Sequence, residues 1–595
     1  MKLDVKKIAK NIGVFIIVYA VIFSFYLSVS ISVGTSGFYL HMRRFLLAAL
    51  VCVLPYYCIR GFKLKNYLPE LFLSLLWCIP SPVFLYISAK AHGASSLSMP
   101  YDVAIGAYLF GFLAFTKYIL SRWSEYRFLS ALYTGFLFLL AIIPCVNLVY
   151  YSIFKSPLGL NGTMAIYQTN VSEAMEYLSS LGIMQICMIV VVIVIALYCV
   201  KLNVENLLDM SQHSCSKKKL ACLGVMAIAA GYYSFFSLIP RTHIVGLMKA
   251  TGEYFESVER YGAQHDKIYE NLHVIDNNEN DKGTIIMVIG ESATRNYMKA
   301  FNEKNDDTTP WLSSVKNSGD FILFPNAYSC AWNTVPALEH ALTEANYYNN
   351  KEFNKSVSIV DVAKKSGYKT YWFSNQGRVG VHDTPITMVA ETSDVVEFGG
   401  DSVYDEGLLT HLKKVNRNEK NFIVLHIMGS HIDYNNRYPK EYQIWTDPDH
   451  SGRVADYKNS LVYTDKFLHD VYEYSKANLD LKALVYFSDH GTDPNRTRDP
   501  DETRFIGLRV PLFVYLSPEY QDNHCKVVLG LKGNKEQFFS NDLVYDLMCG
   551  IFDIESENYD ESNSLTSTKY KYDKNSVKAG LGTKMVKDDP YLQGD

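Results

Sequence analysis

The apolar residues of this chain are concentrated in its first 240 positions, and this uneven distribution constrains the fold more than any other feature. That part consists of apolar runs close to the roughly 20 residues that span the hydrocarbon core of a membrane, separated by short polar loops. From residue 251 onward the chain has the mixed composition of a water-soluble domain. The sequence therefore predicts a transmembrane domain at residues 1–240, followed by a soluble half.

Seven spans are predicted within this domain, and Pro80 and Pro82 predict a kink in the third. The alternative is a count of five or six, which matters because an even number would place the soluble half in the cytoplasm. The predicted spans are 11–32, 43–59, 68–89, 101–120, 128–153, 181–200 and 219–239.

Basic residues gather in alternate loops, which indicates how the spans are oriented. Loops 90–100 and 154–180 contain only Lys90 and Lys155, although Arg43 and Arg44 run against the pattern. The bias favours an odd number of spans, a cytoplasmic amino-terminus and a soluble half outside the cytoplasm. The basic residues on the amino-terminal side are Lys2, Lys6, Lys7, Lys10, Arg60, Lys63, Lys65, Arg122, Arg127, Lys201, Lys217, Lys218 and Lys219.

The charge and the cysteines exclude two classes of protein. A net charge of −4 gives no basic footprint for nucleic acid. Eight of the 11 cysteines lie in the first 222 residues, mostly inside apolar runs, and there is no CxxC pair. One disulfide between Cys525 and Cys549 is compatible with the sequence, but a disulfide framework is not.

In the soluble half, a polar connector at 241–283 leads into alternating strands and helices. This alternation predicts an α/β domain with a mainly parallel sheet between helices at residues 284–555. The polar composition of residues 556–595 predicts a loosely ordered tail. The predicted strands are 284–290, 369–374, 421–428, 481–488 and 510–516, with a further apolar segment at 321–330, and the predicted helices are 311–315, 336–344, 357–366, 453–476 and 535–552.

Two of these strands end in residues of the metal-ligand type. The apolar run 284–290 leads into Glu291, and the run 481–488 leads into Asp489 and His490. Open α/β sheets bind their ligands at the carboxyl ends of parallel strands. Alternatively, Glu291 would stabilise the first turn of a following helix, and Asp489-His490-Gly491 would be a turn whose histidine is satisfied locally.

Thr334 and His431 occupy comparable positions. Thr334 precedes a predicted helix that begins near Pro336, where a side-chain oxygen is either a plain cap or a nucleophile close to free N–H groups. His431 follows a strand and is either structural or part of a site. Carboxylates with one imidazole suit zinc or manganese and leave a coordination position open for catalysis. A threonine hydroxyl held there would be activated as a nucleophile.

Several short motifs, in this order, resemble those of the inner-membrane phosphoethanolamine transferases, whose catalytic domain belongs to the alkaline phosphatase/sulfatase superfamily. The resemblance covers most of residues 150–552. The motifs are Gly290-Glu-Ser-Ala-Thr-Arg295, Asp307-Thr-Thr-Pro310, Ser329-Cys-Ala-Trp-Asn-Thr334, Phe373-Ser-Asn-Gln376, His426-Ile-Met-Gly-Ser-His431, Tyr438-Pro439, Tyr463-Thr-Asp465 and Ser488-Asp-His-Gly491.

The resemblance implies roles for individual residues. Thr334 would become phosphoethanolaminylated, and His431 would contact the phosphate or shuttle a proton. The resemblance implies one zinc site, with Glu291, Thr334, Asp489 and His490 as ligands. The loop 154–180, whose pattern alone predicts an interfacial helix, resembles the periplasmic substrate loop of the family. The implied substrate-binding residues are Thr169, Glu173, Asn375, Arg378 and His382.

The chain also departs from the lipid A-modifying members of the family. Residues 492–523 contain no histidine, so a second zinc ion is not assigned. A lysine expected after residues 372–376 is missing, and Arg378 or His382 would take its place. The disulfides of those members are absent as well. These departures favour an acceptor other than lipid A, with lipopolysaccharide core as the first choice.

The implied function is transfer of phosphoethanolamine from phosphatidylethanolamine to lipopolysaccharide, at its core sugar or lipid A. The implied location is the inner membrane of a Gram-negative cell, with the catalytic domain in the periplasm. The alternatives are phosphoglycerol transfer, another periplasmic glycan as acceptor, and a membrane sensor with a decayed domain. A sulfatase is excluded because residues 329–338 contain no Cys/Ser-x-Pro-x-Arg motif.

Overall fold

The computed structural model describes residues 5–33, 38–59, 61–92, 99–123, 127–154, 156–168, 216–277, 282–376, 384–446, 453–496 and 503–593, with scattered positions in 183–198. The chain divides into two compact units. Unit 1 comprises residues 1–163 and 181–252, and unit 2 comprises residues 164–180 and 253–595.

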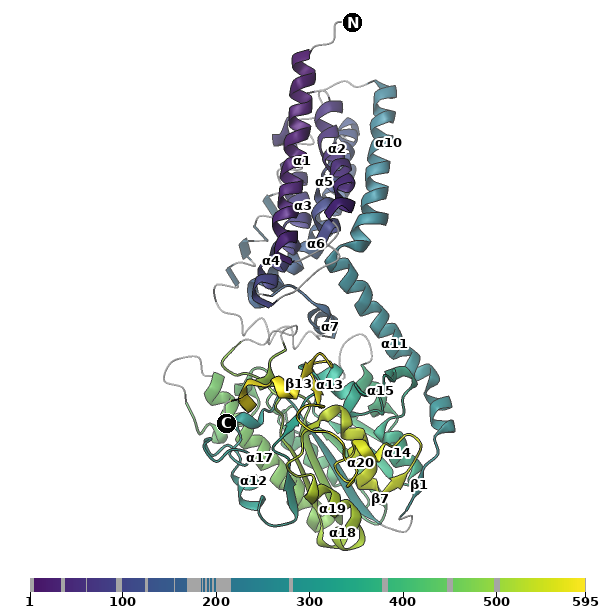
Figure 1. Ribbon diagram of the computed structural model, residues 1–595, viewed down its shortest axis with the longest axis vertical. Coiled ribbons are helices and arrows are strands. Elements are labelled where there is room, and N and C mark those ends of the chain that lie inside the picture. Colours follow the sequence, from purple (N-terminus) through teal and green to yellow (C-terminus); the bar gives the residue numbers. More distant parts are fainter. Residues whose placement is uncertain are drawn as a thin grey trace. The chain divides into compact units, whose positions relative to one another are not determined.

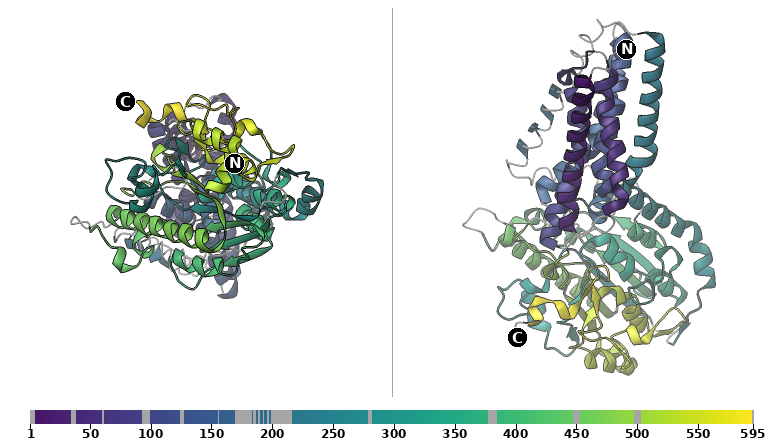
Figure 2. Two further views of the ribbon diagram at one scale, coloured as in Figure 1. Left: turned by 90° about the horizontal axis from the view of Figure 1, so that it is seen from below. Right: turned by 45° about the horizontal axis from the view of Figure 1, so that its top comes forward.

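Unit 1 is built from long apolar helices (Figures 1 and 2). Among the described residues, five helices are long and apolar enough to cross a membrane, and a shorter apolar stretch runs over Arg44–Cys58. The five candidates are Ala9–Val29, Leu64–Ile87, Met99–Leu120, Phe128–Phe154 and Lys217–Arg241. They correspond to five of the seven predicted spans. The prediction 43–59 corresponds to the shorter stretch, and most of 181–200 lies outside the described residues.

The helices of unit 1 pack around α5. Its candidate span is 78% buried, whereas the other four are 11–44% buried. Glycines allow this close approach: a Cβ on Gly106 would lie 2.5 Å from Cys78 Sγ, and one on Gly111 would lie 2.6 Å from Val51 Cγ1. The kink predicted at Pro80 is a break between α3 and α4. The helices are α1 (Val5–Val33), α2 (Phe38–Cys58), α3 (Leu68–Cys78), α4 (Pro80–His92), α5 (Met99–Leu120), α6 (Arg127–Phe154) and α10 (Lys217–Tyr233), and α7 (Leu160–Gln168) continues from unit 1 into unit 2.

Unit 2 contains a seven-stranded sheet in the order β3-β9-β8-β2-β7-β5-β6. The five strands from β8 to β6 are parallel, whereas β9 is antiparallel to β8, and the edge strand β3 is antiparallel to β9. The prediction of a mainly parallel sheet is therefore confirmed. The strands are β2 (Gly283–Gly290), β3 (Phe321–Leu323), β5 (Lys369–Ser374), β6 (Val395–Phe398), β7 (Lys420–His426), β8 (Leu481–Ser488) and β9 (Leu512–Leu516).

Helices cover both faces of this sheet because its central strands are apolar on both sides. In β2, Ile285, Met287 and Ile289 belong to one buried cluster, whereas Ile286 and Val288 belong to another. The first cluster includes residues of α13 (Thr334–Ala341), α14 (Ile359–Lys365) and α20 (Val544–Phe552), and the second includes residues of α12 (Pro310–Val315) and α17 (Arg453–Asn478).

The carboxyl-terminal segment differs from its prediction. Instead of a loose tail, residues 556–593 contain a short hairpin, β12 (Lys578–Ala579) with β13 (Lys584–Met585), and bury Leu565 and Val577 completely. Its polar side chains find partners in the domain: Asp589 accepts from Arg509 Nε at 2.7 Å and from the Tyr328 hydroxyl at 2.9 Å. Composition misled because these polar groups are paired within the fold.

The predicted helix 535–552 is shorter in the structure. Residues Phe539–Ser540 form the strand β10, which pairs with β4 (Ala327–Tyr328), and α20 begins at Val544. The predicted connector contains the helix α11 (His243–Asn271).

Candidate active site

Three metal-ligand side chains meet because β2 and β8 are adjacent and parallel. Gly290 pairs with Ser488 at the last register position, so the next residues, Glu291 and Asp489, leave the sheet side by side. The N–H of Asp489 donates to the carbonyl oxygen of Gly290 at 2.9 Å, which fixes this arrangement. The ligand atoms of Glu291, Asp489 and His490 all lie within 4.8 Å of one another.

The geometry of His490 directs its Nε2 atom toward the carboxylates. Its Nδ1 atom lies 2.8 Å from the carbonyl oxygen of Gly491, and a carbonyl oxygen can only accept. Nδ1 therefore carries the proton, and the lone pair of a neutral ring is on Nε2. Nε2 lies 3.5 Å from Glu291 Oε1 and 3.4 Å from Asp489 Oδ2.

Thr334 is the first residue of α13 and completes the cluster. Its hydroxyl donates to Glu291 Oε2 at 3.0 Å and lies 3.3 Å from His490 Nε2. The hydroxyl therefore contacts two of the three ligand-type side chains, in the first turn of a helix, where negative charge is favoured.

The burial of this cluster demands a positive partner. Glu291 and Asp489 are only 1% and 0% exposed. Burial, and then the neighbouring carboxylate of Glu291, raise the pKa of Asp489 well above its usual range. Within the described residues, Asp489 Oδ2 is buried without a hydrogen-bond partner. Two carboxylates, an imidazole lone pair and a hydroxyl are a donor set that fits zinc, with the positive charge that these buried acids lack.

Neighbouring groups orient both carboxylates. Ser292 donates from its hydroxyl to Glu291 Oε1 at 2.6 Å and from its N–H to Asp489 Oδ1 at 3.1 Å. Gln376 Nε2 lies 3.4 Å from Glu291 Oε2 and donates to the carbonyl oxygen of Ile427 at 2.9 Å. The hydroxyl of Thr294 is bonded to backbone carbonyls of Ile506 and Arg509. Ser292 and Thr294 are thus supporting residues.

The structure places the other predicted site residues less directly. His431 follows Ser430, whose N–H donates to the carbonyl oxygen of Glu291 at 3.0 Å, so its segment lies beside the site. His431 is not a member of the metal-ligand group found among the described residues. Asn375 donates to the buried carboxylate of Asp405 at 2.9 Å. Thr169, Glu173, Arg378 and His382 lie outside the described residues.

Asn541 supports the site and was not predicted. Its Nδ2 donates to the carbonyl oxygen of Asp489 at 2.7 Å, and its Oδ1 accepts from the N–H of Cys330 at 2.8 Å. The hydroxyl of Ser329 also donates to the carbonyl oxygen of Asp489, at 2.6 Å. This network joins the segment that leads to Thr334 to the end of β8. No local signal marks Asn541, because it lies inside a stretch with a helical pattern.

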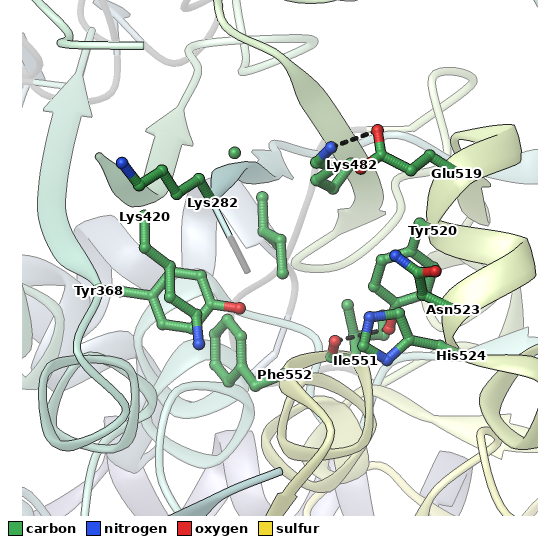
Figure 3. Close-up of a pocket in the computed structure, with 12 residues that line it drawn as sticks. Lys282, Tyr368, Lys420, Lys482, Glu519, Tyr520, Asn523, His524, Ile551 and Phe552 are labelled. Atoms are coloured by element: carbon green, nitrogen blue, oxygen red, sulfur yellow. Dashed lines mark hydrogen bonds and ion pairs between the residues drawn. The ribbon is translucent and has the colours of Figure 1, made fainter. Parts of the chain in front are cut away.

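A pocket at the opposite ends of the strands is separate from this cluster (Figure 3). It is lined by residues at the amino ends of β2, β7 and β8, such as Gly283, Lys420 and Lys482. Two of the charged side chains that line it are already paired: Lys482 Nζ lies 2.6 Å from Glu519 Oε2, and His524 Nδ1 lies 2.9 Å from an Asp553 oxygen.

The chain is similar in sequence to proteins of known family. A family model described as Sulfatase matches residues 283–551. The chain is 26% identical over 421 residues to phosphoethanolamine transferase EptC of Escherichia coli K12, covering 63% of this chain and 72% of that protein. It is 24% identical over 483 residues to phosphoethanolamine transferase CptA of Salmonella typhimurium, covering 71% and 80%.

A solved structure has the same fold in both parts of the chain. The integral membrane lipooligosaccharide phosphoethanolamine transferase A (EptA) of Neisseria meningitidis matches with a TM-score of 0.56 and 17% identity, over 84% of this chain and 98% of that chain. The shared architecture is a set of apolar helices followed by a sulfatase-like α/β domain.

Proposed function

We propose that this chain, a member of the phosphoethanolamine transferase family of the alkaline phosphatase superfamily, transfers phosphoethanolamine from phosphatidylethanolamine to lipopolysaccharide through Thr334. The proposed acceptor position is the core sugar or lipid A, with the core sugar as the first choice. The five candidate membrane helices make it a multi-pass membrane protein. We place it in the inner membrane of a Gram-negative cell, with unit 2 in the periplasm.

The zinc ion of the proposal would be held by Glu291, Thr334, Asp489 and His490. Bound there, it would supply positive charge that makes the Thr334 hydroxyl easier to deprotonate. The donor set and the unsatisfied buried oxygen of Asp489 support this assignment.

The proposed first step forms a bond between Thr334 Oγ1 and phosphorus and breaks the bond to diacylglycerol, which leaves with a proton. The contact of 3.0 Å between Oγ1 and Glu291 Oε2 carries this proposal. Because the carboxylate accepts the hydroxyl hydrogen, the lone pairs of Oγ1 are directed away from the carboxylate, where they can attack phosphorus. In the second step an acceptor hydroxyl attacks the phosphorus, the bond to Thr334 breaks, and its oxygen regains a proton. His431 is proposed to contact the phosphate or to carry a proton in these steps.

The test is Thr334→Ala in the full-length protein, with mass spectrometry of lipopolysaccharide as the readout. We expect no added phosphoethanolamine, whereas the control Thr410→Ala, whose hydroxyl only bonds the carbonyl oxygen of Gly407, should transfer normally. Transfer at the normal rate by Thr334→Ala to any envelope acceptor would contradict the proposal.

Phosphoglycerol transfer is the second candidate, because the nucleophile and the metal ligands would be the same. The mass added to Thr334 in the trapped intermediate separates the two groups. If neither group is found and the protein binds no zinc, the alternative of a non-enzymatic membrane sensor is supported instead.

A further inference from the structure

Two arginines in unit 1 share one tyrosine ring at one end of the candidate spans. The Cζ atoms of Arg44 and Arg241 lie 4.1 Å and 5.6 Å from the ring centroid of Tyr101. Arg44 Nη2 also donates to the Tyr101 hydroxyl at 3.4 Å. The two positive charges are therefore within about 10 Å of each other, close enough to repel in a medium of low dielectric constant.

The sequence positions place this cluster at a membrane surface. Arg44 begins the apolar stretch of α2, Tyr101 lies in the first turn of α5, and Arg241 is the last residue of the fifth candidate span. Helix α10 packs against α5 (Figure 1), and the N–H of His243 donates to Asp102 Oδ1 at 2.9 Å. The chain continues from Arg241 through α11 into unit 2, so the cluster is at the end of the spans from which the catalytic unit follows.

Both guanidinium groups have unused capacity to bind an anion. Neither forms an ion pair with a carboxylate in the described part of the chain, and Arg44 Nη1 is buried without a hydrogen-bond partner there. Arg241 is exposed and donates to the hydroxyl of Ser237 at 3.1 Å. A guanidinium presents paired N–H donors that match a phosphate group, and a buried donor without a partner costs free energy.

The position of Arg44 also contradicts the charge rule for this chain. Basic residues are concentrated on the other side of the predicted membrane, where orientation requires them. An arginine on the side of the catalytic unit therefore has to be explained by something other than orientation. The headgroup layer at this depth contains phosphodiesters.

We propose that Arg44, Tyr101 and Arg241 form a binding site for the phosphodiester of a glycerophospholipid in the membrane leaflet on the side of unit 2. The two guanidiniums would hold the phosphate, and the ring of Tyr101 keeps them in place through cation–π contacts. If the bound lipid is the donor, the site would present phosphatidylethanolamine at the membrane surface, and that part of the inference rests on the proposed function.

The test uses the full chain in nanodiscs that contain photoactivatable lipid analogues, with mass spectrometry of the labelled peptides. Phosphatidylethanolamine and phosphatidylglycerol probes should label peptides around residues 38–44, 99–104 and 237–243, whereas a diacylglycerol probe, which lacks the phosphate, should not. Loss of a charge-assisted hydrogen bond is worth about one decade or more in affinity. Arg44→Gln/Arg241→Gln should therefore reduce the labelling about tenfold or more.

Further variants keep the outcome clear. Arg241→Gln alone changes only an exposed side chain, so it should fold and should still reduce the labelling. Thr334→Ala should be labelled as strongly as the unmodified protein, which separates lipid binding from transfer. Equal labelling by the diacylglycerol probe, or labelling that is unchanged in both arginine variants, would overturn the proposal even if the transferase function stands.

Discussion

Each unit of this protein buries a group of charged side chains, but only one group is balanced. In unit 1, Lys117 Nζ lies 3.0 Å from both carboxylate oxygens of Glu70, and the Tyr133 hydroxyl donates to the same carboxylate at 3.2 Å. In unit 2, two carboxylates, Glu291 and Asp489, lie beside His490 with no lysine or arginine in the group, and Asp489 Oδ2 has no hydrogen-bond donor among the described residues.

Charge balance, more than burial, therefore distinguishes a structural cluster from a candidate site. The side chains of Glu70 and Lys117 are both 0% exposed, yet the opposite charges and the tyrosine satisfy them. That cluster joins α3, α5 and α6 and requires no further ligand. Two adjacent buried carboxylates are unfavourable unless a cation or a proton joins them, so the group in unit 2 indicates metal binding.

The largest expected effect comes from removing one metal ligand. Asp489→Asn should lose bound zinc and lower the rate of transfer about a thousandfold or more, as when one member of a catalytic group is removed. Metal content by plasma mass spectrometry and the lipopolysaccharide assay measure this. Asp573→Asn, at an exposed position, is the control and should keep both zinc and activity.

The thermal stability of the same variant reports whether the cluster in unit 2 is balanced without metal. Without metal, Asp489→Asn should unfold at the same temperature as the metal-free parent or at a higher one, because one of two adjacent carboxylates has been neutralised. A clear loss of stability in the metal-free form would mean that this cluster, like the one in unit 1, is already balanced.

Lys117→Met should have the opposite effect on unit 1. It leaves Glu70 buried without its cation, which costs about 3–5 kcal/mol of unfolding free energy. Adding Glu70→Gln should restore part of the loss, and Lys219→Met, at an exposed position, should change little. Unfolding in detergent micelles measures all of these. If Lys117→Met leaves the unfolding free energy unchanged, the ion pair between Lys117 and Glu70 does not contribute to the stability of unit 1.

His426 is a third buried group, and its charge state should appear in the acid stability of the protein. Burial lowers its pKa to about 4, whereas an exposed histidine titrates near 6.5. The unfolded chain then binds more protons between these values, so stability falls as the pH drops from about 6.5 to 4, by on the order of 3 kcal/mol. His426→Gln should flatten this part of the curve of unfolding free energy against pH. An unchanged slope would show that His426 does not cause the loss of stability at low pH.

The smallest predicted effect concerns the support of Glu291. Gln376→Leu removes the amide 3.4 Å from Glu291 Oε2 and should weaken zinc binding about tenfold, the lower end of the range for residues that orient metal ligands. Competition with a chelator of known affinity measures this directly. Gln376→Glu instead adds a third negative charge near the two carboxylates, and its zinc affinity is compared with that of Gln376→Leu. If the zinc affinity of Gln376→Leu is unaltered, Gln376 does not orient Glu291 and serves only to bond the carbonyl oxygen of Ile427.

Local patterns predicted the metal-ligand group for a physical reason. A buried strand is recognisable from its apolar run, and parallel strands bring their carboxyl ends to one edge of the sheet. Glu291 and Asp489 follow such runs, so their meeting could be expected without knowing the register. The same reasoning placed His431 beside the site but could not say what its ring contacts.

Sequence order could not reveal the groups that support this site. Asn541 bonds Ser329, which is 212 positions away, and no pattern near either residue indicates that contact. The carboxyl-terminal segment is another example, since its polar composition predicted looseness although Asp589 is bonded to Arg509, 80 positions earlier.

Local sequence patterns were enough to predict the division into an apolar and a soluble part, the α/β class, and the ligand-type residues that follow β2 and β8, because each of these depends on neighbours along the chain. Only the tertiary structure decided which charges are balanced. Lys117 meets Glu70 across 47 positions, Asn541 reaches Asp489 across 52, and Arg44 and Arg241 meet at Tyr101 from separate helices. Electrostatic and hydrogen-bond energies depend on distance in space, and that distance is fixed only when the helices and the sheet pack.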